Sequence, residues 1–234
     1  MISVRTKLYF SMENLILQQF FVFTFSERHD KMCSYLYFSF LRGQTMDSNF
    51  FALISRMRYI ARWGLMRNAL PENIQEHSHM VAVLAHALGV IRRDIFHQPC
   101  DVNALATAAL YHDASEILTG DLPTPIKYHN AEIMSAYHAV EDLAVQKLLG
   151  MLPPELRETY ADVLAEDKDG DIYPLVKAAD KLSAYIKCIE ERKAGNNEFL
   201  SAEAQTRAAL EASPLPEVQY FLCLLYTSDA ADDR

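Results

Sequence analysis

The sequence of 234 residues has few cysteines, and no two of them form a C-x-x-C pair. Such pairs are typical of thiolate metal sites and redox motifs, whereas scattered thiols are typical of a reducing compartment. We therefore expect a cytoplasmic protein without a thiolate metal site, in which Cys188, inside a helical pattern, is a core residue. The four cysteines are Cys33, Cys100, Cys188 and Cys223.

Basic residues are also scarce. The 22 lysines and arginines are outnumbered by 31 aspartates and glutamates, for a formal net charge of -9 and a pI near 5.3. A protein that wraps a nucleic acid needs clustered Lys and Arg to neutralise phosphates, so we expect no nucleic acid polymer as a partner. A small anionic substrate is still allowed, because a pocket needs only one or two local cations.

No apolar run is long enough to span a membrane. The run from Leu15 to Phe25 has eleven residues and is interrupted by Gln18 and Gln19, whereas a membrane-spanning helix needs about 20 residues. No small-residue cleavage site follows the run, as a secretion signal would require. We therefore expect neither a membrane anchor nor a secreted protein.

The two ends differ from the rest of the chain. Residues 1–45 hold ten of the 24 Phe and Tyr residues in no clear period, and Met46 is followed by Asp47 and Ser48, a typical helix-capping start. We predict a non-native or disordered extension at 1–45, one folded domain at 46–221, and a non-native or disordered tail at 222–234. The alternative for the first segment is a structured N-terminal extension.

The folded part is predicted to be all-α. No segment alternates as a half-buried strand does, and apolar residues recur at helical spacing instead. Helix-ending Gly and Pro residues separate the patterns. Helices are expected over Phe50–Gly64, Ile74–Gly89, Asn103–Thr119 and Ala131–Leu149, then from Pro154, from Pro174 to Ile189, and from Asn197 to Ala212.

Four ionisable side chains lie within the stretch from Tyr111 to Asp121, at the end of an almost wholly aliphatic helix pattern. His112 and Glu116 are four residues apart and share a helix face, and Asp113 lies about 100° round from His112. Burying such groups without partners costs several kcal/mol, and a metal ion commonly offsets that cost. The pattern therefore indicates a metal site.

Two other predicted helices offer further ligands. His77 lies near the start of the second helix, and Asp180 lies beside the apolar stripe of the helix that begins at Pro174. Two imidazoles and two carboxylates suit Mn²⁺, Co²⁺, Zn²⁺ or Fe²⁺ better than Mg²⁺. The ligand types alone do not choose among these metals.

The order His, His-Asp, Asp resembles the HD-domain metal-dependent phosphohydrolases, a family of helical bundles. Five sequence blocks over residues 46–221 are similar to one branch, the bacterial 5′-deoxynucleotidases. These blocks are Arg62-Trp63, Glu76-His77-Ser78, the stretch 111–116, the stretch 119–127 and Lys177-Ala178-Ala179-Asp180-Lys181-Leu182. The resemblance implies a homodimer that uses one divalent ion, Co²⁺ or Mn²⁺ with Zn²⁺ or Fe²⁺ as alternatives, to hydrolyse deoxyribonucleoside 5′-monophosphates with a metal-activated water.

The resemblance also assigns roles to residues. Glu116 is implied as the general acid or base, Arg62 as the phosphate ligand, and Trp63 as the group that packs on the sugar and excludes a 2′-hydroxyl. Asp121 is implied in both catalysis and binding. Metal ligands are His77, His112, Asp113 and Asp180, and the remaining substrate contacts are Leu122, Pro123 and Thr124, with His77, Asp113 and Asp180 also facing the substrate.

Each role has a simpler structural alternative. Glu116 alone is compatible with a structural ion pair, Arg62 with a helix C-cap, and Trp63 with core packing. Among the other histidines, His86 is expected to be a buried, hydrogen-bonded core residue. The charged set 190–193 is expected to form a solvated helix face. Two alternative functions remain open at this point: a phosphohydrolase for a cyclic or pyrophosphorylated nucleotide, and a metal-stabilised module that binds nucleotide without turnover.

Overall fold

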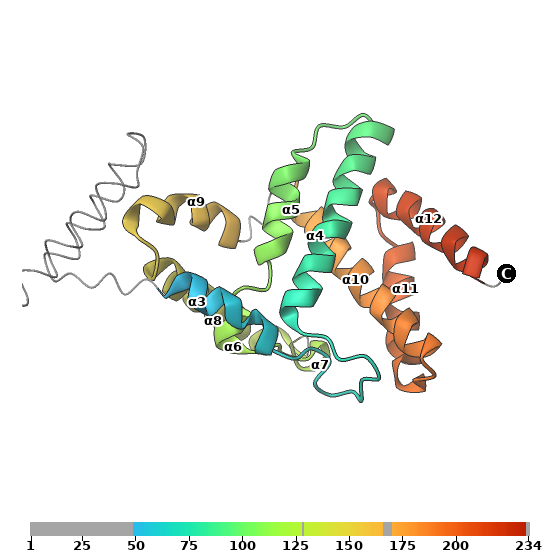
Figure 1. Cartoon of the computed structure of the whole chain (residues 1–234), viewed down its shortest axis with the longest axis horizontal. Coiled ribbons are helices and arrows are strands. Elements are labelled where there is room, and N and C mark those ends of the chain that lie inside the picture. The colour runs from blue at the N-terminus through green and yellow to red at the C-terminus, as the bar shows by residue number, and fades with distance from the viewer. Residues whose placement is uncertain (1–48, 128, 166–169, 233–234) are drawn as a thin grey trace, which may run out of the picture. The chain divides into compact units, whose positions relative to one another are not determined.

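The computed structural model of the chain describes residues 49–127, 129–165 and 170–232, all within the unit Ser48–Arg234. The predicted extension at 1–45 lies outside the described residues. Within these ranges the structure is helical and contains no strand (Figure 1). The only β-bridge in these ranges is an isolated antiparallel one between Ala61 and Asn73. The predicted all-α class is confirmed.

The helices begin where capping residues allow them to. The side chains of Asn73, Asp101 and Asn130 accept hydrogen bonds from the first free N–H groups of three helices, as capping residues do. The elements are α3 (Phe50–Ile54), η1 (Ser55–Tyr59), α4 (Ile74–Val90), η2 (Ile91–Ile95), α5 (Val102–Tyr111), α6 (Glu116–Thr119), α7 (Thr124–Lys127), α8 (Ala131–Gly150), α9 (Pro154–Leu164), α10 (Tyr173–Lys193), η3 (Asn197–Phe199), α11 (Leu200–Glu211) and α12 (Pro216–Asp232).

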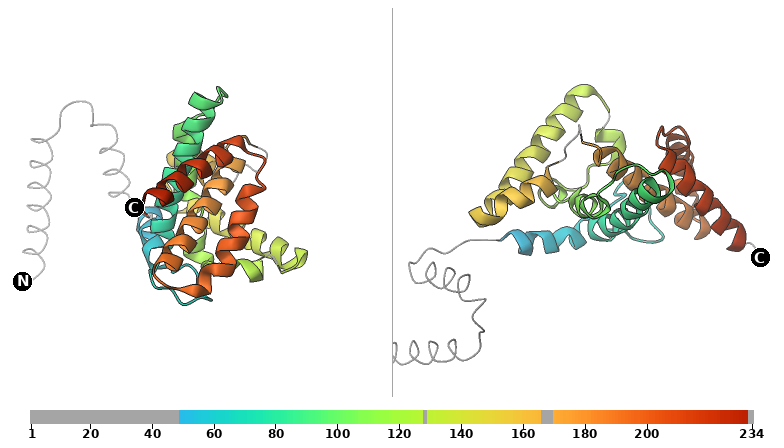
Figure 2. Two further views of the ribbon diagram at one scale, coloured as in Figure 1. Left: turned by 90° about the vertical axis from the view of Figure 1, so that its right-hand side faces the viewer. Right: turned by 90° about the horizontal axis from the view of Figure 1, so that it is seen from above.

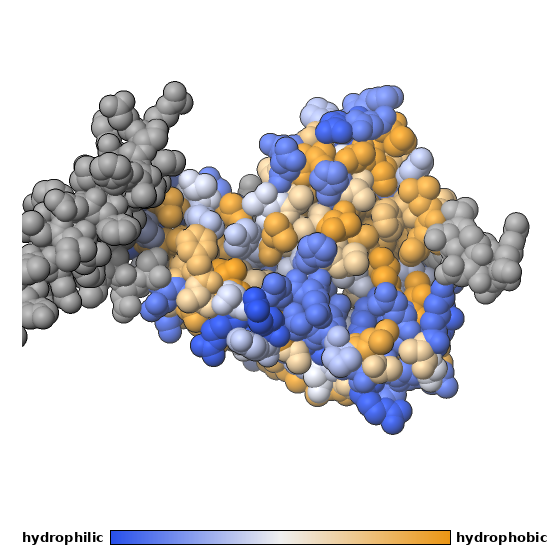
Figure 3. All heavy atoms as spheres, viewed as in Figure 1, coloured by the Kyte–Doolittle hydropathy of each residue, from blue (hydrophilic) through white to orange (hydrophobic). Residues whose placement is uncertain are grey.

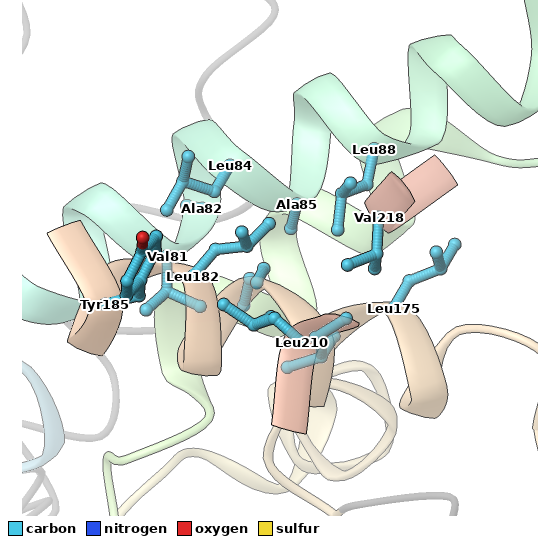
Figure 4. Packing of buried hydrophobic residues seen from close by; sticks show 14 of the residues in the cluster. Val81, Ala82, Leu84, Ala85, Leu88, Leu175, Leu182, Tyr185, Leu210 and Val218 are labelled. Carbon is cyan, nitrogen blue, oxygen red and sulfur yellow. The ribbon is translucent and has the colours of Figure 1, made fainter. Parts of the chain in front are cut away.

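The main core lies between α4, α5 and α10, with α11 and α12 closing one side. Figure 4 shows the side chains of α4 and α10 meeting in this core, with Leu210 and Val218 completing it. Helix α4 approaches α5 closely at Gly89, where an added Cβ would lie 3.0 Å from Leu105 Cδ2. Helices α4 and α10, which carry the ligand candidates His77 and Asp180, are therefore packed together in this core.

A second cluster joins α3, α8 and α9. Phe50 and Leu148 are fully buried in it, and Tyr160 packs edge-on to the Phe50 ring with centroids 5.0 Å apart. Ala114, in the turn after α5, is also part of this cluster. Figure 2 shows α8 and α9 on the opposite side of α4 and α5 from α11 and α12. This cluster therefore fixes the segment that carries His112 and Asp113 from the side opposite the main core.

The first predicted helix is shorter than expected. Helical structure ends at Tyr59, and Ile60 is extended, with φ -93° and ψ 108°. The Arg62 N–H donates to the Glu72 carbonyl at 3.0 Å, and the Ile74 N–H donates to the Ile60 carbonyl at 3.0 Å. Arg62 therefore lies in a loop closed by cross-chain hydrogen bonds and not at a helix terminus, so the helix prediction over 60–64 was wrong. Local periodicity carries no information about such pairing.

The helix expected over 103–119 is also interrupted. It breaks into α5 and α6, and residues 112–115 form a tight turn. Ala114 N–H donates to the Tyr111 carbonyl at 2.9 Å and Glu116 N–H donates to the Asp113 carbonyl at 3.0 Å. These are bonds to the third preceding residue, which tighten a helix end. His112 and Asp113 therefore stand at a break in the helix, where their side chains can converge.

Three further expectations differ from the structure. Helix α12 continues past the predicted boundary at 221, and Leu222 is buried in the main core while Leu225 packs against it. His86 is exposed and not a core residue. Glu191 is fully buried, so the set 190–193 is not a uniformly solvated face. That residues 222–234 are non-native stays a prediction.

The surface in the view of Figure 3 mixes hydrophilic and hydrophobic side chains, with apolar residues showing over α4 and α5. Val83 on α4 and Leu110 on α5 are among the exposed apolar side chains. Cys188, by contrast, is buried as predicted. In the part of the chain that the structure describes, no helix combines the length and apolar character that crossing a membrane requires.

Candidate functional site

Ligand atoms from His77, His112 and Asp180 lie within 4.8 Å of one another. His77 is on α4, Asp180 on α10 and His112 in the turn after α5, so three core elements meet here. His77 Nε2 lies 3.0 Å from Asp180 Oδ1 and 3.5 Å from Asp113 Oδ2. His112 Nε2 lies 3.2 Å from Asp113 Oδ2. The structure thus brings together all four residues that were predicted as metal ligands.

The second nitrogen of each imidazole is held by a hydrogen bond. His112 Nδ1 lies 2.7 Å from the Ala109 carbonyl, which only accepts, so Nδ1 carries the proton and Nε2 of the neutral ring carries a lone pair. His77 Nδ1 lies 3.2 Å from the Ser183 hydroxyl. Outer hydrogen bonds of this kind orient metal-binding histidines.

Both Nε2 atoms are buried without a hydrogen-bond partner. Buried polar nitrogens are normally satisfied, and leaving one unpaired costs free energy. Two imidazole nitrogens that face carboxylates across a buried site are the arrangement that a divalent cation satisfies. The residues present therefore fit a metal ion.

The carboxylates of the cluster are ionised. Burial alone would raise the pKa of Asp113, but His112, His77 and Arg62 lower it well below its usual range. Burial likewise opposes ionisation of Asp180, and the neighbouring His77 imidazole nevertheless lowers the Asp180 pKa strongly. Two negative charges in a buried site provide the electrostatic complement to a divalent cation.

Glu116 has the opposite protonation state. Its side chain lies at the start of α6 with 6% of the residue exposed, and its Oε2 has no hydrogen-bond partner. Burial, together with the negative charges of Asp113 and Asp121, raises the pKa of Glu116 to about 10. In this arrangement Glu116 carries a proton at neutral pH, whereas the neighbouring Asp113 does not. Carboxyl groups whose pKa values are pushed apart in this way are typical of acid–base chemistry.

Arg62 is the cation of the site. Its Nη1 donates to Asp113 Oδ2 at 3.3 Å and its Nε to Glu72 Oε2 at 3.2 Å. Burial would lower the pKa of Arg62, but the carboxylates of Asp113, Asp180, Asp121 and Glu72 raise it. The guanidinium thus lies among the acidic groups of the site and not at a helix C-cap.

Asp121 follows α6 directly. Gly120 precedes it with φ +76°, a backbone conformation that favours glycine. Burial raises the pKa of Asp121, and Arg62 and a backbone hydrogen bond from Trp63 oppose this rise. Among the other predicted substrate contacts, Leu122 and Pro123 are half-buried after Asp121, and Thr124 is exposed at the start of α7. No contact of these three side chains with the cluster is seen among the described residues.

Two residues of the site had no sequence signal. Ser183 is one turn after Asp180 on α10 and faces His77, although serine in an amphipathic helix is unremarkable by itself. Glu72 lies in the loop before α4 and contacts both Arg62 and Trp63. Its residue type and spacing are those of any exposed loop glutamate.

Comparison with known families identifies the family of the chain. The family model described as 5′-deoxynucleotidase YfbR-like matches residues 49–228. The chain belongs to the YfbR-like 5′-deoxynucleotidase family. Its relatives in this family include the 5′-deoxynucleotidase YfbR of Shigella boydii, which is 51% identical over 177 residues, covering 75% of this chain and 89% of the relative. The resemblance stated from the sequence motifs is confirmed.

Solved structures show the fold of the chain. An HD-domain phosphohydrolase from Listeria innocua matches with a TM-score of 0.70 at 24% identity, over 78% of this chain and 89% of that one, which shows the HD-domain fold. The HD phosphohydrolase DatZ of cyanophage S-2L matches with a TM-score of 0.51 at 25% identity, over 77% of this chain and 96% of that one. That structure is described as bound to dA and one catalytic Zn²⁺ ion.

Proposed function

We propose that this protein is a metal-dependent phosphomonoesterase that hydrolyses deoxyribonucleoside 5′-monophosphates to deoxynucleoside and phosphate. The observation that carries the proposal is the convergence of two buried Nε2 atoms without hydrogen-bond partners, those of His77 and His112, on the carboxylates of Asp113 and Asp180. Arg62 contacts the same cluster through Asp113. Membership of the YfbR-like family supports the substrate class.

In the proposed site His77, His112, Asp113 and Asp180 hold one divalent ion. When bound, such an ion activates a water and polarises a phosphoryl oxygen. Co²⁺ or Mn²⁺ is proposed from the family resemblance, and the Zn²⁺ in the described DatZ structure supports a mixed nitrogen and oxygen site of this kind. Fe²⁺ fits the same ligand types.

Arg62 is proposed to bind the phosphate. A planar guanidinium recognises phosphate with two parallel N–H groups, and this charged hydrogen bonding is stronger where water is excluded. Arg62 is mostly buried, with 14% of its side chain exposed, and it already lies 3.3 Å from Asp113. A phosphate at this position would therefore lie between the guanidinium and the metal ligands.

Glu116 is proposed as the general acid. As water adds to phosphorus, the bond from phosphorus to the 5′ oxygen breaks, and the proton on the Glu116 carboxyl passes to that oxygen. The phosphate takes the two protons of the water and returns one of them to Glu116, which restores the acid. The released deoxynucleoside is then a neutral alcohol at its 5′ position. A group that is already protonated at neutral pH suits this task, and positioned acids of this kind contribute about 10²–10⁴-fold to rates.

The sugar is proposed to lie against Trp63, with Asp121 and the backbone of Leu122, Pro123 and Thr124 contacting the nucleotide. The Asp121 carboxylate accepts a backbone hydrogen bond from Trp63. The residue proposed to face the sugar is therefore linked directly to the residue proposed to contact the nucleotide. A rigid indole next to C2′ would exclude a 2′-hydroxyl. A homodimer is proposed from the family resemblance, and a cytoplasmic location from the scattered cysteines.

The test is phosphate release from dAMP and AMP by metal-stripped protein, with Co²⁺, Mn²⁺, Zn²⁺ or Mg²⁺ added back. Metal-dependent release from dAMP well above AMP supports the proposal. Faster cleavage of a cyclic or pyrophosphorylated nucleotide would replace the substrate class. Binding of dAMP and metal without release of phosphate from any of these nucleotides would indicate a non-catalytic module.

A further inference from the structure

One oxygen of Glu72 serves two residues of the substrate site. Glu72 Oε2 accepts from Trp63 Nε1 at 2.9 Å and from Arg62 Nε at 3.2 Å. The Glu72 side chain is 15% exposed, so both hydrogen bonds are largely shielded from water. A single carboxylate thereby connects the residue proposed to bind the phosphate with the residue proposed to face the sugar.

Trp63 needs such an anchor because its backbone is strained. Its φ of 60° lies in the left-handed region, which a bulky residue adopts only when the surrounding structure imposes it. The indole ring is fixed by two contacts: a tilted packing on the buried Phe199 ring at 5.2 Å and the hydrogen bond to Glu72. Packing alone leaves the ring free to tilt about Phe199, whereas the hydrogen bond fixes its in-plane direction.

For Arg62 the same carboxylate fixes the orientation of the guanidinium. Glu72 holds the Nε edge, which directs the terminal nitrogens toward Asp113 and the metal ligands. A long arginine side chain has considerable rotamer entropy, and holding it before the substrate arrives lowers the cost of binding.

We propose that Glu72 is the positioning residue that sets both phosphate affinity and the choice of deoxyribose over ribose, by orienting Arg62 and Trp63 through one oxygen. This inference rests on the proposed function of the site. Among the described residues no hydrogen bond or ion pair joins Glu72 to the candidate metal ligands, so it acts through the two residues that it holds.

The loop itself does not depend on the Glu72 side chain. It is closed by backbone hydrogen bonds, from Arg62 N–H to the Glu72 carbonyl and from Ile74 N–H to the Ile60 carbonyl, both 3.0 Å. Substitutions at position 72 keep these bonds. Glu72→Ala is therefore expected to fold, and Glu72→Gln keeps a neutral oxygen that can still accept both donors.

The experiment compares Glu72→Ala and Glu72→Gln with the matched control Glu76→Ala, an exposed glutamate four residues along. Glu72→Ala should raise the KM for dAMP by about ten- to a hundredfold, the usual effect of losing a hydrogen bond to a charged group. It should also reduce the selectivity for deoxyribose, measured as kcat/KM for dAMP divided by kcat/KM for AMP. Glu72→Gln should recover part of both losses, and Glu76→Ala should resemble wild type.

Two further measurements separate positioning from general damage. Trp63 is the only tryptophan of the chain, so its fluorescence emission reports the Glu72 contact without any substrate, and it should change in Glu72→Ala but not in Glu76→Ala. In a Trp63→Phe background, which lacks the indole N–H, Glu72→Ala should no longer alter the dAMP-to-AMP ratio.

Unchanged Trp63 emission in Glu72→Ala would overturn the inference, as would an unchanged dAMP-to-AMP ratio or an effect fully additive with Trp63→Phe. Failure of the proposed function can be told apart from failure of this inference, because wild-type protein would then release no phosphate from dAMP. In that case the emission change alone decides whether Glu72 orients Trp63.

Discussion

Replacing Glu191 with alanine should strongly destabilise the fold. Glu191 is fully buried on α10, and its two oxygens accept four hydrogen bonds. Two donors are the backbone N–H groups of Ala69 and Leu70 in the loop between Trp63 and α4, and the others are the side chains of Lys187 and Asn196. The carboxylate therefore attaches the loop between Trp63 and α4 to the core helix α10.

The size of the effect follows from these partners. Each hydrogen bond to a charged group is worth about 1.5–3 kcal/mol, and four of them sum to about 6–12 kcal/mol if counted separately. The loop donors are partly buried and regain water when the acceptor is removed, so the sum is an overestimate. Removing one partner of a buried ion pair costs about 3–5 kcal/mol. We therefore expect Glu191→Ala to lower the free energy of unfolding by about 3–5 kcal/mol, because Lys187 keeps its charge in a buried site.

The assay is urea denaturation followed by far-ultraviolet circular dichroism and by the fluorescence of Trp63. The control is Glu190→Ala, because Glu190 is exposed on the same turn of α10 and surface changes of this kind stay within about 0.5 kcal/mol. If both variants unfold at the same urea concentration, the buried carboxylate does not stabilise the protein and the reasoning is refuted.

The same group predicts a pH dependence. Burial would raise the pKa of Glu191, but the hydrogen bonds from Lys187, Asn196, Leu70 and Ala69 lower it to about 2 from an ordinary value of 4.5. A carboxyl with a lowered folded-state pKa stabilises the fold above its unfolded-state pKa, and this contribution is lost as pH falls toward the folded-state value. The stability difference between wild type and Glu191→Gln should therefore shrink as pH falls from 5 toward 2. A difference that is constant over this range would contradict the lowered pKa.

Three other perturbations test the site and the core. Glu116→Gln should keep its metal, measured by plasma mass spectrometry, and lose about 10²–10⁴-fold in kcat, so near-wild-type turnover would rule out a general acid at this position. His112→Ala should lose stoichiometric metal together with the metal-dependent rise in melting temperature, and retention of both would exclude His112 as a ligand. Gly89→Ala should cost about 1–3 kcal/mol in urea denaturation, because its Cβ would lie 3.0 Å from Leu105 Cδ2 and 3.3 Å from Val102. Helix propensity alone predicts that the free energy of unfolding rises by about 1 kcal/mol, and that result would show that α4 and α5 move apart at little cost to accept the added Cβ.

Much of the fold was predictable because its signals are local. The helical spacing of apolar residues, the capping of α4 by Asn73 and the proline at the start of α9 lie within one or two turns of the structure that they specify. The same holds for the ligand candidates. Histidine and aspartate in an apolar helical pattern indicate a metal site wherever the helices finally pack, and the structure brings His77, His112 and Asp180 together.

The sequence by itself therefore determined the helical class, the chemical types of the candidate metal ligands and the family. Only the tertiary structure decided that Arg62 and Trp63 lie in a hydrogen-bonded loop, that Glu72 joins them, and that Glu191 is buried. The physical reason is distance along the chain, since Glu191 meets Leu70 across 121 residues. A charged side chain has the same local pattern whether it faces water or a buried donor, and only packing brings that donor to it.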